Sequence, residues 1–310
     1  MNSTYSWNLS RLRCVSIRIV VVCFVALTVS CEATDVVKVS EFPEQARPVA
    51  ESISIVSWNA EKGGNDQFKP DLARLVLMDK PDFVFLQEAQ ADLLTTPRIG
   101  GYFASSWRYP WANGKTIGML ALSHIPPARI QPMRSKHKEF MVTAPKLSLV
   151  TEYPLGNGQS LLAVNVHLLA FERWSTTGFG SQMDDLKTVM EKHTGPIILV
   201  GDFNTWNQKR LDLVEKVIVE VGLTEVTEFS SERRTGDKES PFLNWLFGID
   251  EALPLDRVYY RGFTHHSAKV LPYDSSDHRA IQVTLELAPS ELQPPYYIQS
   301  IVWHCPEYSC

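Results

Sequence analysis

The hydrophobic positions of this chain follow two different periods, and the change between them predicts a domain of strands and helices. Residues 52–58 alternate serine with isoleucine or valine, which is typical of a strand. Continuous apolar runs at 83–86 and 196–200 indicate strands that are buried on both faces. The remaining predicted strands span residues 117–122, 146–153, 160–168, 255–260, 268–271 and 280–287.

Apolar residues spaced three and four apart predict three helices between these strands. They lie around residues 72–76, 183–190 and 211–221. Pro81 would end the first helix, and Gly222 would cap the third, because glycine readily adopts the left-handed conformation found after many helices.

The connections between the predicted strands indicate how the strands are arranged. Asn157-Gly158 lies between strands 146–153 and 160–168, and this pair is a strong signal for a hairpin. The order is mixed, with strands in pairs and helices between the pairs. Such an order favours two packed sheets covered by helices over one parallel, doubly wound sheet.

Both ends of the chain differ from its middle. Arginines precede an apolar run at 19–29, which is shorter than the roughly 20 residues of a membrane span and has the layout of a secretory signal. Residues 27–31 also resemble a lipoprotein processing site with Cys31 as the acylated residue, and an uncleaved short anchor is a third alternative. The predicted organisation is a signal peptide, lipoprotein signal or anchor at 1–33, a linker at 34–50, a folded domain at 51–288 and a C-terminal tail at 289–310.

Charge and cysteine content narrow the cellular setting. The formal net charge of the 310 residues is −5 and no Lys/Arg-rich block is present, which disfavours tight non-specific binding of duplex DNA but leaves room for a local basic cleft. All five cysteines lie near the ends, so the domain needs neither a disulfide nor a thiolate metal site, and Cys305 and Cys310 are either paired or unpaired. We expect an exported monomer without a protein partner, either periplasmic, secreted or attached to a membrane through its N-terminus.

Acid, amide and imidazole side chains gather where the predicted strands end. Residues at strand ends line the crevice where loops converge, and α/β proteins place their ligands there. Carboxylate and amide oxygens suit hard ions such as Mg²⁺ or Mn²⁺, whereas zinc would favour more His or Cys. The candidate residues are Asn59, Glu88, His167, Asp202, Asn204, Asp256, Asp277 and His278.

Each candidate taken alone also has an ordinary structural explanation. His167, between Val166 and Leu168, could be a hydrogen-bonded core histidine. Asp256 could pair with a neighbouring arginine on the surface, which would contribute little stability. Taken together and in this order, the candidates favour metal-assisted attack on a phosphate ester, because a cation can neutralise the charge that develops on phosphate.

The ordered set resembles the endonuclease/exonuclease/phosphatase superfamily of DNase I-like proteins over roughly residues 52–287. The matching segments are Ser57-Trp58-Asn59, Leu86-Gln87-Glu88, Asn165-Val166-His167, Gly201-Asp202-Phe203-Asn204, Leu255-Asp256-Arg257-Val258 and Ser276-Asp277-His278. Three further segments are similar to an uncharacterised bacterial branch: Gln87-Glu88-Ala89-Gln90, Tyr153-Pro154-Leu155 and Asn157-Gly158-Gln159. The resemblance implies an α/β (α+β) fold, a four-layer sandwich in which two mixed β-sheets pack face to face with helices outside.

The resemblance also implies a function and a set of roles. The activity would be divalent-metal-dependent hydrolysis of phosphoric ester bonds, by in-line attack of an activated water. The metal, Mg²⁺ or Mn²⁺, would be held by Asn59, Glu88 and Asp277, with Glu61 as a further candidate ligand. The catalytic residues would be His167, Asp202, Asn204, Asp256 and His278, and the substrate phosphate would contact Lys146.

Within this set, the resemblance gives the catalytic residues separate jobs. Asp202 and Asn204 would position or activate the attacking water. His278, oriented by Asp256, would act as general base or bind a phosphate oxygen. His167 would bind phosphate or assist the leaving group.

The substrate stays open at this level. A nuclease, a phosphoesterase that acts on a phospholipid or small organophosphate at a membrane surface, and a non-catalytic binding module with the same fold are the alternatives. Aromatic residues at 107–111 and 242–247 could stack on unpaired bases, enter a membrane interface or pack onto the domain. The inositol-phosphatase class is disfavoured, since Pro254-Leu255 precede Asp256 in place of the Trp-Cys or Trp-Thr typical of that class.

Overall fold

The computed structural model describes residues 36–44, 49–93, 99–108, 116–139, 145–156, 158–170, 172, 175–229 and 253–289. The chain separates into two units, Met1–Asp35 and Val36–Cys310, and every described residue belongs to the second. The predicted signal or anchor, the tail from residue 290 and most of both aromatic-rich stretches lie outside the described residues. Within the described part, no helix is long and apolar enough to cross a membrane.

Two mixed β-sheets form the two central layers. The first has the spatial order β1 (Val36–Ser40), β4 (Gly100–Arg108), β5 (Thr116–Ser123), β3 (Phe83–Gln90), β2 (Ser52–Asn59), β13 (Ile281–Leu287) and β12 (Phe263–Val270). The second has the order β10 (Thr224–Glu225), β11 (Asp256–Arg261), β9 (Ile197–Asp202), β8 (Ser160–His167), β7 (Pro145–Pro154) and β6 (Arg129–Lys138). The pairs β2–β3 and β8–β9 are parallel, and the other pairs are antiparallel.

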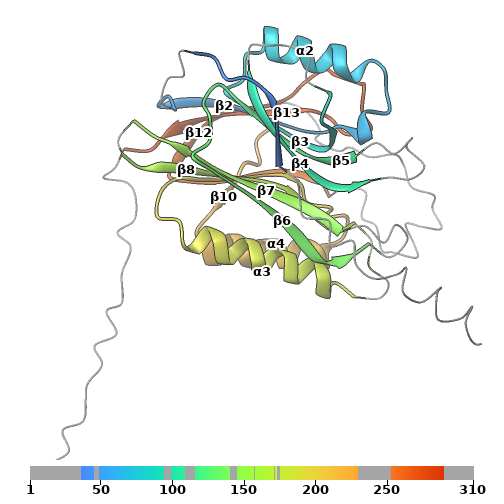
Figure 1. The fold of residues 1–310 in the computed structure, drawn as a ribbon. Helices are drawn as coiled ribbons and strands as arrows, with labels where there is room; N and C mark the ends of the chain where they lie inside the picture. The colour runs from blue at the N-terminus through green and yellow to red at the C-terminus, as the bar shows by residue number, and fades with distance from the viewer. Residues whose placement is uncertain are drawn as a thin grey trace, which may run out of the picture. The chain divides into compact units, whose positions relative to one another are not determined.

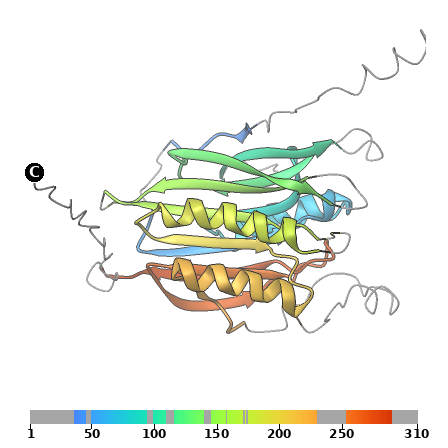
Figure 2. The ribbon, with the colours of Figure 1, turned by 90° about the horizontal axis from the view of Figure 1, so that it is seen from below.

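Helices form the two outer layers. Helix α2 (Phe68–Met78) covers the first sheet, and helices α3 (Thr177–Glu191) and α4 (Gln208–Val221) cover the second (Figure 1). Seen from below, α3 and α4 run side by side across the second sheet (Figure 2). The predicted four-layer sandwich is therefore confirmed.

The alternation of apolar side chains along the strands builds three cores. On β2, Ile53 and Ile55 enter the core between the sheets, whereas Val56 and Trp58 pack under α2. The third core lies between the second sheet and the helices α3 and α4. Central strands thus bury both faces, which explains the continuous apolar runs that predicted them.

Several elements differ from the sequence prediction. Strand β1 occupies 36–40, inside the segment that we expected to be a linker, and the prediction missed β4 and β6 entirely. Strand β12 begins at Phe263 rather than at residue 268. Strands β1, β6 and β12 lie at sheet edges, where exposed polar residues weaken the alternating pattern. Gly222 does cap α4, with a φ of 72°, and strands β7 and β8 form the predicted hairpin.

A buried pair of amides joins the two sheets near their strand ends. Gln87 Nε2 on β3 donates to Asn165 Oδ1 on β8 at 2.7 Å. Asn165 Nδ2 donates back to the carbonyl oxygens of Leu86, at 3.1 Å, and Leu120, at 3.3 Å. Both amide side chains are completely buried, so each depends on these bonds to offset the loss of water. The bonds fix the sheets relative to each other directly beside Glu88.

We expect Asn165→Leu to lower the free energy of unfolding by about 1–3 kcal/mol, because it leaves the buried Gln87 donor without this acceptor. Urea unfolding followed by circular dichroism measures the change. The control is Gln208→Ala, which removes an exposed amide that bonds to Asp212 on α4 and should change stability by at most about 0.5 kcal/mol. Equal stability of Asn165→Leu and wild type would contradict the importance of the inter-sheet bonds.

Candidate active site

Three of the predicted site residues lie in one row across the second sheet. His167 on β8 is the register partner of Asp202 on β9, and Asp202 is in turn the partner of Asp256 on β11. Gly201, with a φ of 140°, makes this row possible, because a Cβ there would lie 2.1 Å from the carbonyl oxygen of Val166. The glycine before the aspartate is therefore required by the close approach of β8 and β9.

Asp202 is the centre to which the other polar groups converge. Its Oδ2 accepts a hydrogen bond from Asn59 Nδ2 at 3.0 Å and lies 3.5 Å from His167 Nε2 and 3.9 Å from His278 Nε2. Its Oδ1 accepts from the backbone N–H of Asn204 at 2.9 Å. Asn59 belongs to the first sheet, so this carboxylate connects residues of both sheets at the open end of the sandwich.

His278 and Asp256 form a buried pair. Nδ1 of His278 lies 2.7 Å from Asp256 Oδ2, and the indole N–H of Trp58 donates to the His278 carbonyl oxygen at 2.9 Å. Burial disfavours the charged ring, but the carboxylates of Asp256 and Asp202 outweigh it and raise the pKa of His278 to about 10. His278 is therefore an imidazolium at neutral pH.

The arginines near Asp256 have other partners, so a surface ion pair does not explain this residue. Arg257 Nη1 donates to Glu225 Oε1 at 2.8 Å, and Arg261 Nη1 donates to the carbonyl oxygen of Val221 at 2.9 Å. Asp256 is 1% exposed and faces His278 instead. Its position is therefore that of a residue that orients an imidazole ring.

Glu88 is directed into the site by an irregularity in its own strand. The β3–β5 pairing bulges at this position, and Glu88 adopts a left-handed backbone with a φ of 48°. Its carboxylate lies 2.8 Å from Lys62 Nζ, 3.5 Å from Lys146 Nζ and 3.7 Å from His167 Nε2. Burial alone would raise the pKa of Glu88, but Lys146, His167 and Lys62 hold it well below the ordinary value.

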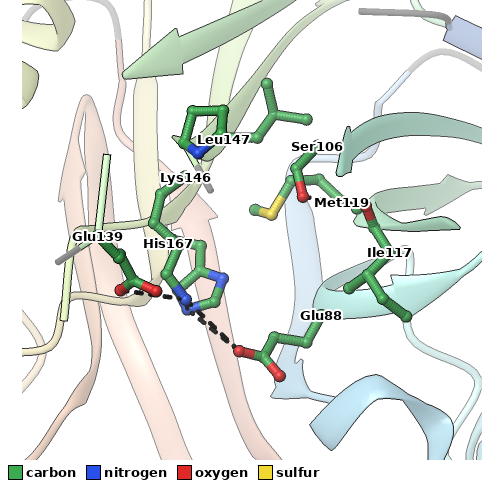
Figure 3. Close-up of a pocket in the computed structure, with 10 residues that line it drawn as sticks. Glu88, Ser106, Ile117, Met119, Glu139, Lys146, Leu147 and His167 are labelled. Carbon is green, nitrogen blue, oxygen red and sulfur yellow. Dashed lines mark hydrogen bonds and ion pairs between the residues drawn. The ribbon is translucent and has the colours of Figure 1, made fainter. Parts of the chain in front are cut away.

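Lys146 lines the pocket drawn in Figure 3, beside Glu88 and His167. Its ammonium lies 2.9 Å from His167 Nε2 and 3.5 Å from a carboxylate oxygen of Glu139. Burial, followed by the charge of Lys146, lowers the pKa of His167 to about 4. His167 is thus neutral at pH 7, and its Nε2 accepts from the ammonium, which assigns the ring proton to Nδ1.

Asn204 lies in a strained loop after β9, and its side chain holds this loop in place. Its φ is 50°, and its side-chain amide donates to a backbone carbonyl at 2.9 Å. Beneath the loop, the buried guanidinium of Arg210 donates to the carbonyl oxygens of Leu169 and Asn204, and it lies over the rings of Phe179 and Trp206. This arginine was not predicted, because its bond to the Leu169 carbonyl oxygen and its contact with Phe179 join segments that are distant along the chain.

Asp277 and Glu61 lie at the rim of the site. The backbone N–H of Asp277 donates to Glu61 Oε2 at 3.1 Å, and the N–H of Glu61 donates to Asn59 Oδ1 at 3.0 Å. Asp277 is exposed, and these bonds connect it to Asn59 through Glu61. The structure therefore joins all the predicted residues into one network. It adds Lys62, Glu139 and Arg210, which the sequence did not indicate. It also adds Gln87 and Asn165, which lie in the matching segments but had no predicted role.

The donors at this end of the sandwich suit a hard divalent cation by chemical type. Among the described residues, no group of three or more His, Cys, Asp or Glu side chains could hold a metal by itself. The expected set, however, includes the amide oxygen of Asn59 as well as the carboxylates of Glu88, Glu61 and Asp277. Glu88 already accommodates positive charge, since two ammonium groups contact its carboxylate. The residues present therefore fit an oxygen-ligated cation centred on Glu88.

The sequence profile of the Endonuclease/Exonuclease/phosphatase family matches residues 56–278, a span that contains all of the predicted catalytic and metal-binding residues. The chain belongs to this family. Membership of this family indicates a hydrolase that acts on phosphoester bonds. Among its relatives, the UPF0294 protein of Vibrio campbellii is 32% identical over 237 residues, 76% of this chain and 78% of the relative. A UPF0294 protein of Yersinia pseudotuberculosis is 30% identical over 245 residues, 77% and 85% of the two chains.

Several solved structures have the same fold as this chain. An endonuclease/exonuclease/phosphatase from Beutenbergia cavernae superposes with a TM-score of 0.56 at 16% identity, covering 78% of this chain and 72% of that one. The human nocturnin catalytic domain with bound sulfate gives 0.56 at 16%, covering 82% and 98%. D. rerio TDP2 complexed with a single-strand DNA product gives 0.54 at 15%, covering 76% and 100%.

We expect Lys146→Met to raise the pKa of His167 above its value of about 4, because the change removes the ammonium that opposes protonation of the ring. NMR titration of ¹⁵N-labelled histidines, assigned with a His167→Gln variant, measures the shift. Lys136→Met is the control, since Lys136 pairs with Asp185 on α3 at 2.7 Å and does not contact the ring. An unchanged His167 titration in Lys146→Met would show that the ammonium does not control this ring.

The His278–Asp256 pair predicts a dependence of stability on pH. The pKa of His278 is raised from 6.5 to about 10, so its stabilisation is complete below pH 6.5 and is lost as the pH rises through about 10. We expect the stability advantage of wild type over Asp256→Asn to shrink across this window, by at most about 1.4 kcal/mol per pH unit. Urea unfolding in EDTA from pH 6 to 10.5 measures it.

The matched control is Asp82→Asn, which removes a carboxylate that accepts from the backbone N–H of Ser54 at 2.8 Å and has no histidine partner. Its stability difference from wild type should stay constant over the same window. A constant difference for Asp256→Asn as well would mean that the folded state does not hold the extra proton on His278.

Proposed function

We propose that this protein is a divalent-metal-dependent phosphodiesterase that hydrolyses a phosphoric ester by in-line attack of water. The observation that carries the proposal is the position of Asp202, whose carboxylate lies 3.9 Å from the His278 ring and accepts from Asn59 at 3.0 Å. A carboxylate beside a buried imidazolium places a group that can orient water next to a group that can bind a phosphate oxygen.

The raised pKa of His278 favours one of its two expected roles. A general base must be able to accept a proton, whereas the Asp256 carboxylate keeps this ring protonated at neutral pH. We therefore assign His278 to binding a phosphate oxygen, with Asp256 fixing the ring through Nδ1. Asp202 then orients the attacking water, and the backbone N–H of Asn204 fixes Asp202 through its other oxygen.

Glu88 and Asn59, with Glu61 and Asp277 at the rim, would hold the divalent cation, Mg²⁺ or Mn²⁺. When bound, this cation supplies positive charge that offsets the charge developing on the phosphate. The proposal draws support from the family match and from the cationic surroundings of Glu88.

Lys146 and His167 occupy the other side of Glu88. The Lys146 side chain is 12% exposed, and its ammonium lies between Glu88, Glu139 and His167. This placement supports a role in compensating charge and orienting the neutral ring of His167, in addition to the phosphate contact expected from the sequence. His167 is then available as a hydrogen-bonding partner for the leaving group rather than as a cation.

For the substrate, we propose single-stranded nucleic acid as the first class to test. The support is that D. rerio TDP2, which shares this fold, is described with a single-strand DNA product. Phospholipids and small organophosphates remain the alternative, because the predicted export signal would bring the protein to a membrane surface.

We expect Glu88→Gln and His278→Gln each to lower kcat/KM by at least about a hundredfold. The first removes the charged carboxylate that would hold the cation, and the second removes the positive charge that would bind the phosphate oxygen. Hydrolysis of bis-p-nitrophenyl phosphate with Mg²⁺ or Mn²⁺ measures the loss. Glu220→Gln is the control, because Glu220 pairs with Lys187 on the helical surface at 2.9 Å. Wild-type turnover that persists in EDTA, or full activity of both variants, would refute the metal-dependent reaction.

The same assay separates the substrate classes. A panel of single-stranded DNA, duplex plasmid DNA, RNA, sphingomyelin, phosphatidylinositol phosphates and bis-p-nitrophenyl phosphate covers the alternatives. Preferred cleavage of single-stranded DNA or RNA supports the nuclease assignment, and preferred cleavage of a lipid supports the alternative. Failure to cleave every member would favour a binding module that kept the fold.

A further inference from the structure

Lys62 is the cation closest to the proposed principal metal ligand. Its Nζ lies 2.8 Å from Glu88 Oε2, whereas Lys146 Nζ lies 3.5 Å from Oε1. The two lysines therefore contact opposite oxygens of one carboxylate. They also differ in exposure, since the Lys62 side chain is 45% exposed and that of Lys146 only 12%. Lys146 is built into the interior, but Lys62 can move into solvent.

The backbone that carries Lys62 is firmly held. Glu61 and Lys62 both adopt left-handed conformations, with φ of 43° and 61°, in the short 3₁₀ turn η1 (Glu61–Gly63). The N–H of Glu61 donates to Asn59 Oδ1, its carboxylate accepts from the N–H of Asp277, and the Gln90 side chain donates to the Lys62 carbonyl oxygen. Residues in this strained conformation persist only where their surroundings impose it.

This clamped turn contacts the same groups that would hold the cation. Asn59, Glu61 and Asp277 are joined by its hydrogen bonds, and the Lys62 side chain reaches across to Glu88. A divalent ion on Glu88 Oε2 and the Lys62 ammonium on the same oxygen would repel each other at short range. The two cations are therefore alternative occupants of one carboxylate oxygen.

We propose that Lys62 is a tethered cation that competes with the divalent ion for Glu88 and thereby sets the metal concentration at which the site fills. The proposal rests on the proposed function, because it takes Glu88 as the metal ligand. When the ion binds, the ammonium leaves Oε2 for the solvent on its exposed side. Lys146 stays in place and keeps Oε1 and His167 oriented.

The test is the affinity of the full chain for Mn²⁺, measured by isothermal titration calorimetry in the absence of any substrate. We expect Lys62→Met to bind Mn²⁺ about tenfold more tightly than wild type, because the ion no longer displaces an ammonium. Lys62→Arg, which keeps the charge, should bind no more tightly than wild type.

The matched control is Lys69→Met. Lys69 forms an ion pair of the same length, 2.8 Å, with Asp92, and its side chain is 41% exposed, but it does not contact Glu88. This variant therefore removes one positive charge without freeing the site, and its Mn²⁺ affinity should stay within about twofold of wild type. Equal tightening in Lys62→Met and Lys69→Met would reduce the effect to net charge and overturn the proposal.

Thermal unfolding gives an independent readout that also shows whether the variants fold. In EDTA, Lys62→Met should melt at a lower temperature than wild type, because an ion pair is lost. Added Mn²⁺ should then raise its melting temperature at lower concentrations than it does for wild type, since binding to the folded state stabilises it.

The outcomes separate this proposal from the proposed function. Mn²⁺ binding by wild type with unchanged or weaker affinity in Lys62→Met would overturn the competition but leave the metal-dependent hydrolase standing. No Mn²⁺ binding by wild type, Lys62→Met and Lys69→Met alike would overturn both.

Discussion

The hydrogen bonds that Gln87 and Asn165 make between the sheets are the constraint on which the rest of the site depends. Apolar packing between two sheets is non-directional, so it resists separation more than it resists sliding. The first sheet supplies Asn59 and Glu88, and the second supplies His167 and Asp202. A bond such as the one of 3.0 Å from Asn59 to Asp202 survives only if the sheets keep one offset, and the directional amide bonds fix that offset.

With the two sheets held in place, the contacts between buried charged groups determine the electrostatics of the site. Removing a carboxylate from water disfavours its charged form, whereas neighbouring cations and hydrogen-bond donors favour it. Glu88 has the ammonium groups of Lys62 and Lys146, whereas Asp202 and Asp256 share the ring of His278. The same balance favours the charged form of the His278 ring and the neutral form of the His167 ring, and the different roles proposed for the two rings rest on this difference.

The sequence predicted most of the layers and most of the site, but for different reasons. Central strands and amphipathic helices can be predicted because their burial is periodic. The edge strands β1 and β6 and the first half of β12 carry exposed polar residues that weaken the pattern. Polar residues at strand ends were recognisable by type and order. Lys62, Glu139 and Arg210 were not, because a charged residue beside a loop is usually a surface residue, and only the folded chain brings these three to their partners.

The site is built where the regular fold is interrupted. Glu88 lies in a bulge, Asn204 follows the end of β9, and Lys62 lies in a tight turn, and all three have left-handed backbones. Such conformations cost free energy and are kept by specific bonds, whereas the layers need only apolar side chains of suitable period. The fold is shared at 16% identity, with a TM-score of 0.56 to the Beutenbergia cavernae protein, and a shared fold does not by itself determine the chemistry of the site. Substrate choice in this chain should accordingly be sought at its turns and bulges rather than in its sheets.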